Sequence, residues 1–581
     1  MRYKLPVLAS LAFLVALTAF RFKQHTQISH AAFDPAAYKK TALLRCTPDW
    51  ELMNDWLEDS DIPPIPGAGI YTWEISTSND SAQFYFNQGI NMYYSFHIIE
   101  AMASFKKAAR FDPQCAMLYW AQALTYGPNI NDLGYIASPE ALEATRRATE
   151  LAENASPLEK ALIRAMAVRY TADSADATRA KLNQDYTDMM QAVYQKNPSS
   201  ADAQALYADA MMLQHPWDLW NTDGTPKAWT PLIRKVLEKL LAEYPNHPGG
   251  NHYYIHVMEP SPYAALALPS AERLGKTNPG LSHVVHMPSH IYLRTGYYQK
   301  GVDVNIRAVN SYYKSIQLYA PVTGADFLYI IHNLHMKSNN AMMTGNRKEA
   351  IAAAEETRKS IQPDYLHLEG PLGSYIQYIY MTPLFVDLRY GNWDDILKME
   401  KPATSMSYAN VLYHFGRGMA FSRLHKLTEA SNELDLLRET MKDSVLNVPL
   451  SPFSPVIDGA RVAEQLLLGA IHEEKQMYDG AVRHYTLADS IESAMVYNEP
   501  RDWILNPKQY LGNAYLEAGD AEEAENIFRK DLKYNNENGW ALFGLASALK
   551  KQKKNKETAA VQTRFKKAFA HADTGINAAV Y

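Results

Sequence analysis

The sequence predicts an all-α protein in which helical hairpins stack into a solenoid, with loop insertions around a concave pocket. Apolar residues recur at helical spacing almost end to end, and long alternating runs of β-branched residues are absent. Pairs of small residues twelve positions apart recur along the 581 residues. In addition, His252 and His286 lie 34 residues apart, and so do His256 and His290. A fixed spacing of that length is typical of a repeat architecture.

The small and large residues follow the tetratricopeptide (TPR) pattern, a helix-turn-helix repeat of about 34 residues. Small residues are expected near repeat positions 8, 20 and 27, a large residue near position 24, and proline near position 32. Gly89, Ala101, Phe105, Ala108 and Pro113 fit these positions. We therefore expect a TPR-type solenoid that coils as a right-handed superhelix. The spacing of twelve recurs in Ile255/Ala267, Ser289/Gly301, Ser338/Ala350, Gly418/Ala430, Gly469/Ala481 and Gly512/Ala524.

Four segments are expected along the chain. Residues 1–26 carry Arg2 and Lys4 before an apolar stretch, which indicates either a signal peptide or an N-terminal membrane anchor. The protein should therefore be exported, to the periplasm or cell envelope. Residues 27–81 are expected to be an irregular segment packed on the array, 82–400 an N-terminal TPR array with the histidine-rich site, and 401–581 a C-terminal array with a capping helix. Non-helical insertions are expected at 127–131, 215–227 and 362–373.

Charge and cysteine content narrow the classes of function. The formal net charge is −6, and a protein without a basic face is not expected to bind nucleic acid. Cys46 and Cys115 are the only cysteines, so no disulfide framework supports the fold. Whether these two pair is open, and a small buried residue is the favoured interpretation of Cys115.

The repeat register places histidines on one face. In the repeat that starts at Pro248, His252, His256 and Glu259 take positions 5, 9 and 12 of the first helix. A solenoid sets equivalent positions of successive repeats side by side, so this block should face the next one across the concave groove. In that next repeat, which starts at Ser282, positions 2, 5 and 9 are His283, His286 and His290; the same strip is extended by Asp209, His332 and His335.

These residue types predict a transition-metal site. Imidazole nitrogens suit copper, zinc, iron or nickel, and two histidines one helical turn apart can share an ion. We expect one or two ions (copper, zinc or iron, identity open) bound by His252, His256, Glu259, His283, His286 and His290. Glu259 is either a ligand or the catalytic base that activates a bound water. Hydrolysis and metal-dependent oxidation both remain open. We expect Asp209, His332 and His335 to support the ligands, and Trp217, Asp218 and Trp220 to wall the pocket.

Two other interpretations compete with the metal site. A single histidine in a TPR groove is more often a hydrogen-bonding core residue, but four histidines aligned across one repeat length argue against that. Alternatively, the array is a scaffold for an extended peptide or protein partner at the cell envelope. Clustered histidines beside insertions favour a small-molecule or peptide ligand in the groove, sensed or chemically changed there.

Four motifs resemble a family of exported bacterial TPR-repeat proteins, largely uncharacterised. The resemblance implies fold and export but no reaction. Residues 96–100, Phe-His-Ile-Ile-Glu, depart from the pattern of the family. The motifs are Asp112-Pro113-Gln114-Cys115-Ala116-Met117, Gly127-Pro128-Asn129-Ile130-Asn131, His252 to Glu259, and His286-Met287-Pro288-Ser289-His290-Ile291-Tyr292.

Overall fold

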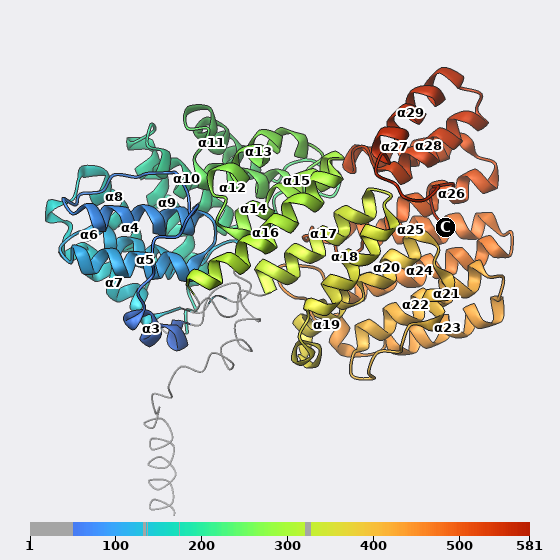
Figure 1. The fold of residues 1–581 in the computed structure, drawn as a ribbon, viewed down its shortest axis with the longest axis horizontal. Helices are drawn as coiled ribbons and strands as arrows, with labels where there is room; N and C mark the ends of the chain where they lie inside the picture. The colour runs from blue at the N-terminus through green and yellow to red at the C-terminus, as the bar shows by residue number, and fades with distance from the viewer. Residues whose placement is uncertain (1–49, 132–134, 136, 174, 320–326) are drawn as a thin grey trace, which may run out of the picture.

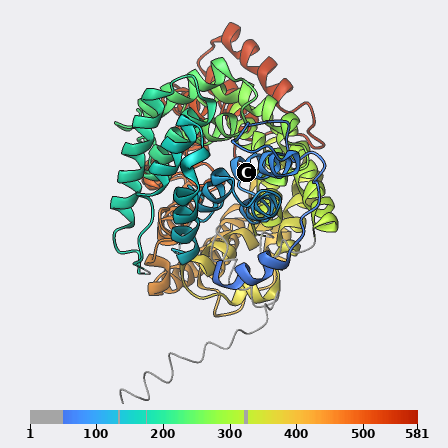
Figure 2. The ribbon, with the colours of Figure 1, turned by 90° about the vertical axis from the view of Figure 1, so that its left-hand side faces the viewer.

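The computed structural model describes residues 50–581, apart from 132–134, 136, 174 and 320–326. The described chain is a long row of antiparallel helices (Figure 1), and seen from its end the row follows a curved path (Figure 2). The β structure in these residues is one isolated bridge between Trp220 and Pro226. The predicted all-α solenoid of TPR type is therefore confirmed. The predicted signal or anchor at 1–26 lies outside the described residues, as do the first part of the 27–81 segment and Cys46.

The first half of the array carries the histidine blocks. It runs through α3 (Trp50–Asp59), α4 (Asp80–Tyr94), α5 (Ile98–Phe111), α6 (Ala116–Thr125), α7 (Pro139–Glu150), α8 (Pro157–Met166), α9 (Arg179–Lys196), α10 (Ala201–Leu213), α11 (Thr230–Glu243), α12 (Pro248–Met258), α13 (Leu268–Thr277), α14 (Ser282–His286), α15 (Pro288–Thr295), α16 (Tyr298–Leu318) and the π-helix η3 (Phe327–His332).

The second half repeats the hairpin without histidine blocks. It contains α17 (Asn333–Met343), α18 (Arg347–Ser360), α19 (Gly370–Tyr380), α20 (Thr382–Tyr390), α21 (Trp393–Lys398), α22 (Ser407–Arg423), α23 (Leu427–Thr440), α24 (Val456–Glu474), α25 (Tyr478–Ala494), α26 (Pro507–Ala518), α27 (Ala521–Tyr534), α28 (Gly539–Lys551) and α29 (Asn555–Ala568). One apolar core extends from Trp50 to Tyr329 and a second from Val302 to Val580. The expected division at residue 400 stays a prediction.

The predicted repeat register is visible in how hairpins close. A Cβ atom added at Gly89 would collide with the ring of Phe105, so the missing side chain is what lets the two helices approach. The same closure joins Gly512 to Phe528 and Gly469 to Tyr485. In each pair the glycine takes repeat position 8 and the ring takes position 24.

Three sequence expectations need correction. The 27–81 segment is not wholly irregular, because α3 lies within it; its later part packs on the array, where Gly280 N–H donates to the Gly67 carbonyl at 2.9 Å. The 362–373 insertion contains the short 3₁₀ helix Pro363–His367 and the start of α19. The second histidine block is not one helix, because Pro288 has no N–H to continue the ladder and divides it into α14 and α15.

In the described part of the chain, no helix combines the length and apolarity needed to cross a bilayer.

Candidate metal centre

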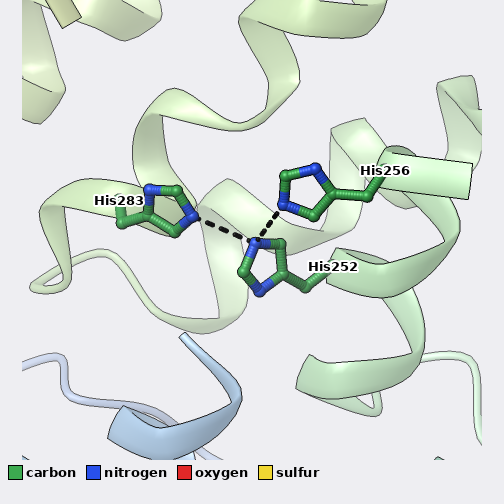
Figure 3. A group of neighbouring side chains, drawn as sticks. All are labelled: His252, His256 and His283. Carbon is green, nitrogen blue, oxygen red and sulfur yellow. Dashed lines mark hydrogen bonds between the residues drawn. The ribbon is translucent and has the colours of Figure 1, made fainter. Parts of the chain in front are cut away.

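Three imidazoles from two helices form the first histidine set, His252, His256 and His283 (Figure 3). His252 and His256 lie one turn apart on α12, and His283 comes from α14. The Nε2 atom of His252 lies 3.1 Å from that of His256 and 3.1 Å from that of His283. Three Nε2 atoms therefore converge on one point.

A second histidine set, His286, His290 and His332, has the same construction. The Nε2 atom of His286 lies 2.7 Å from that of His290 and 3.1 Å from that of His332. His286 ends α14, His290 lies on α15, and His332 ends the π-helix that precedes α17. The wide π turn changes the register just before α17, and such turns are common at functional sites. The structure thus gives His332 an equal place in the centre rather than a supporting one.

Local helix chemistry explains why α12 starts where it does. Its N-cap is His247, whose side chain accepts a hydrogen bond from the N–H of Gly250 at 3.0 Å. Pro248 follows at the first helical position, where its missing N–H costs nothing. This start fixes the phase of the helix, so His252 and His256 share the face that meets α14.

The outer nitrogens of several imidazoles are held by oxygen acceptors. The Nδ1 atom of His252 lies 2.7 Å from the Tyr94 carbonyl oxygen, which can only accept. That of His286 lies 2.7 Å from Asn305 Oδ1, because the Asn305 amide nitrogen already donates to the Gly301 carbonyl. Both imidazoles therefore carry their proton on Nδ1 and present a lone pair on Nε2, the arrangement that metal-binding histidines use.

Glu259 links the two sets. Its Oε1 lies 3.0 Å from His256 Nδ1 in the first set, and its Oε2 lies 2.8 Å from His290 Nδ1 in the second. The hydroxyl of Tyr497 donates to Oε2 at 2.9 Å. A second carboxylate, Glu499, also reaches both sets, 3.3 Å from His256 Nδ1 and 3.9 Å from His290 Nε2. Glu259 thus lies on the Nδ1 side of its imidazoles, as a supporting carboxylate does. The predicted role of Glu259 as a ligand stays open, because His256, Glu259 and Glu499 also bring ligand atoms within 4.8 Å of one another.

Burial and mutual charge govern protonation in the centre. Burial lowers the pKa of His252 and of His286 well below the usual value, and neighbouring imidazoles add to this effect. Burial opposes ionisation of Glu259, yet the positive charge of His290 holds the pKa of Glu259 well below its usual range. Burial also opposes a charge on His290, whose pKa is nevertheless raised by Glu259 and Glu499. Burial, together with the charge of Glu259, raises the pKa of Glu499 well above its usual range.

The centre is enclosed rather than an open strip along a groove. The six imidazoles are between 0% and 8% exposed. Phe96, in a left-handed backbone conformation at φ 57°, covers the first set, with its ring centroid 4.4 Å from that of His252 and 5.6 Å from that of His283.

A cavity of about 290 Å³ adjoins the centre. The 215–227 insertion contributes Trp217, Asp218 and Trp220 to its walls, and the C-terminal half contributes Tyr497 and Trp503. The edge of Trp217 meets the His256 ring at 5.3 Å between centroids. Trp220 Nε1 donates to the Val257 carbonyl at 2.7 Å, and Asp218 pairs with Lys227 at 2.9 Å, so those two do not touch an imidazole through their polar atoms.

Two expected supporting residues lie away from the imidazoles. Asp209 is surrounded by Tyr93, Tyr253 and Arg169, and burial raises its pKa to about 6. The ring of His335 turns toward Tyr378 at 5.6 Å between centroids. Neither nitrogen of His335 has a hydrogen-bond partner among the residues that the structure describes. Neither side chain therefore orients a histidine of the two sets.

Four partners of the centre escaped the sequence reasoning. Glu499 and Tyr497 come from an irregular segment far from the histidines, and Tyr94 contributes only its carbonyl, so no spacing reveals them. Asn305, by contrast, could have been noticed in the sequence. It takes position 24 of its repeat, which other repeats fill with an apolar residue such as Ala271 or Leu434 or with a ring such as Phe105, so a polar residue there marks an unusual repeat.

No family profile and no curated protein matches this chain. Solved structures that resemble it include a human IFIT1 dimer with PPP-AAAA, at 11% identity and a TM-score of 0.30 over 92% of this chain and 100% of that chain. The yeast Tom70 structure is similar at 13% identity and a TM-score of 0.28, over 85% and 95%. The P58(IPK) TPR domain gives 10% and 0.19, over 82% and 99%. At such scores these likenesses carry no functional argument, and the fold rests on the hairpins themselves.

Proposed function

We propose that this chain is a metalloprotein that binds two transition-metal ions in an enclosed centre, one in each histidine set, and acts on or senses a small ligand there. Glu259 then orients one imidazole of each set, and Glu499 is placed to serve as a further ligand or as a base.

One observation carries the proposal. His252 donates a hydrogen bond from Nδ1 to the Tyr94 carbonyl, and His256 Nδ1 faces the Glu259 carboxylate, so the tautomer of each imidazole with its proton on Nδ1 has a lone pair on Nε2. Their Nε2 atoms nevertheless face each other at 3.1 Å. Two lone pairs at that distance repel unless a cation lies between them. The third imidazole of the set, His283, completes a donor triangle that suits a transition metal.

A scaffold for a peptide partner is the competing function. A peptide in a TPR groove contacts exposed side chains spread over several repeats. The histidines here are buried beneath Phe96 and beside the chain around Tyr497, where an extended peptide has no access to them. This burial favours an ion or a small ligand. We also propose export to the periplasm or cell envelope, for which the N-terminal sequence is the only support.

Equilibrium dialysis of the full chain against copper, zinc, iron and nickel in turn tests the metal proposal. At least one metal should bind at two ions per chain with an affinity that survives gel filtration. The variant His414→Ala is the matched control, because His414 is also a buried histidine bound to a carboxylate, Glu433, but lies outside both sets. Retention of fewer than one ion of every metal, together with a protein partner that stays bound in chelator, would establish the scaffold instead.

A further inference from the structure

The two histidine sets lie side by side. Across the sets, the His283 and His286 ring centroids lie 5.9 Å apart and those of His256 and His290 lie 6.3 Å apart. Within a set the centroids lie between 4.6 Å and 6.4 Å apart. The carboxylate of Glu259 also spans both sets. Ions held at the two sets are therefore neighbours that can act on one small molecule together.

The donors favour copper among the metals that imidazole accepts. The six convergent atoms are all imidazole nitrogens, with no sulfur and no carboxylate oxygen in either triangle. Copper heads the divalent affinity order for nitrogen donors, and its lower oxidation state tolerates three neutral ligands. Harder ions such as magnesium or calcium would require the oxygen ligands that these triangles lack.

We infer that the two sets hold a pair of copper ions that binds dioxygen and reduces it by two electrons, an inference that rests on the metal site proposed above. Each cuprous ion gives up one electron, and dioxygen accepts both to reach the oxidation level of peroxide. No proton and no other reductant is needed for this step. The pair gains two positive charges while the peroxide brings two negative ones, so the buried centre keeps the same total charge.

The enclosure is consistent with this chemistry. Dioxygen is small and apolar, so it can reach a centre that Phe96 and Trp217 close to larger polar molecules. Exclusion of bulk water also protects reduced oxygen from release.

Oxygen uptake by the full chain tests the inference. The protein is loaded with Cu(I) without oxygen, its copper content is measured, and a known amount of dioxygen is then added. One dioxygen should be consumed for each two coppers, and the oxidised pair should give no electron paramagnetic resonance signal because the two cupric spins couple. The zinc-loaded chain should consume none. His332→Ala, which removes one ligand of the second set, should bind less copper and lose the coupled uptake, while His414→Ala should behave as the unaltered chain.

The outcomes separate this inference from the metal site itself. Two coppers per chain that turn, in air, into isolated cupric ions with full resonance signals would overturn the dioxygen pair and leave the metal site standing. Two coppers that consume no dioxygen would do the same. A chain that binds no copper would overturn the dioxygen inference, and the metal site would then depend on zinc, iron or nickel in the dialysis.

Discussion

Repeats with and without histidine blocks occupy the same register positions with opposite chemistry. At positions 5 and 9 the histidine repeats carry His252/His256 and His286/His290. The same positions hold Phe415/Met419 in α22 and Leu466/Ala470 in α24, equally buried. The solenoid is therefore built well by apolar side chains at these sites. Buried imidazoles contribute less to packing than apolar side chains, and removing them from water costs free energy, so packing alone does not explain their presence.

The closure of the hairpins differs in the same way. In the repeat of α24 and α25, Gly469 at position 8 receives the Tyr485 ring from position 24. In the repeat that starts at Ser282, these positions hold Ser289 and Asn305, and both side chains lie beside His286 Nδ1, at 3.4 Å and 2.7 Å. In this repeat, polar contacts to the His286 imidazole take the place of the glycine–ring contact that closes the α24–α25 hairpin. The residues that support the histidines therefore occupy ordinary repeat positions, as the histidines themselves do.

The largest expected effect is the loss of an ion from one set at a time. His252→Ala should reduce binding from two ions to one by disrupting the first set, and His286→Ala should do the same to the second, each with an affinity loss beyond about 100-fold. The double variant should bind none. Elemental analysis after gel filtration measures the stoichiometry. Loss of both ions in each single variant would mean that the sets are one site and not two.

Placing a histidine in an apolar repeat and a leucine in a histidine repeat should change the free energy of unfolding in opposite directions. Leu466→His places an imidazole without a metal in the second core and should lower the free energy of unfolding by about 2–4 kcal/mol. His283→Leu removes an imidazole whose Nδ1 has no partner, and in metal-free protein it should raise stability by about 1 kcal/mol or more. Denaturant unfolding of both variants, with Leu466→Met as control, gives the signs. A destabilised metal-free His283→Leu protein would argue that the imidazole is there for structure.

Asp209 should make the free energy of unfolding depend on pH, and replacing it should not change the number of metal ions bound. Burial raises the pKa of Asp209 to about 6, although Arg169 opposes this, whereas the ordinary pKa of the group, expected in the unfolded chain, is 3.8. The folded protein thus binds the proton more tightly between those values, so its free energy of unfolding should fall by about 3 kcal/mol as pH rises through that window. Asp209→Asn should lack this fall and keep two ions. Parallel pH profiles for the two proteins would show an ordinary pKa.

Asn305 should have the smallest and most local effect. Asn305→Ala removes the acceptor that holds His286 Nδ1 and should weaken ion binding to the second set by about 10–100-fold, with the first set unaffected. Asn305→Asp keeps an acceptor and should restore most of the affinity. Metal titration against a competing chelator resolves the two sets. Equal weakening of both sets by Asn305→Ala would indicate a general packing defect.

The fold and much of the candidate site could be predicted because both follow a period. Glycine at position 8 and a ring at position 24 are readable in the sequence, and they close the hairpins as expected, from Gly89 with Phe105 to Gly512 with Phe528. The same register places His252, His256, His283, His286 and His290 together. The register also predicts His332 in the same strip, but only as a supporting residue, because an insertion precedes it and the π turn that brings it to the second set leaves no fixed spacing.

The remaining partners could not be predicted, for physical reasons. Glu499 and Tyr497 lie in an irregular segment that reaches Glu259 from 238 residues away, and irregular chain has no period. Tyr94 acts through its carbonyl, which every residue has. Asp209, by contrast, was predicted as a partner of the histidines but is not one. Its position in the register is correct, but neighbouring tyrosines and Arg169 surround its carboxylate instead of imidazoles.

Anomalous X-ray diffraction from metal-loaded crystals, recorded at the absorption edge of the bound metal, locates the ions directly. We expect two peaks, one inside the Nε2 triangle of His252, His256 and His283 and one inside that of His286, His290 and His332. Peaks at other side chains, or no peak after loading to saturation, would contradict it.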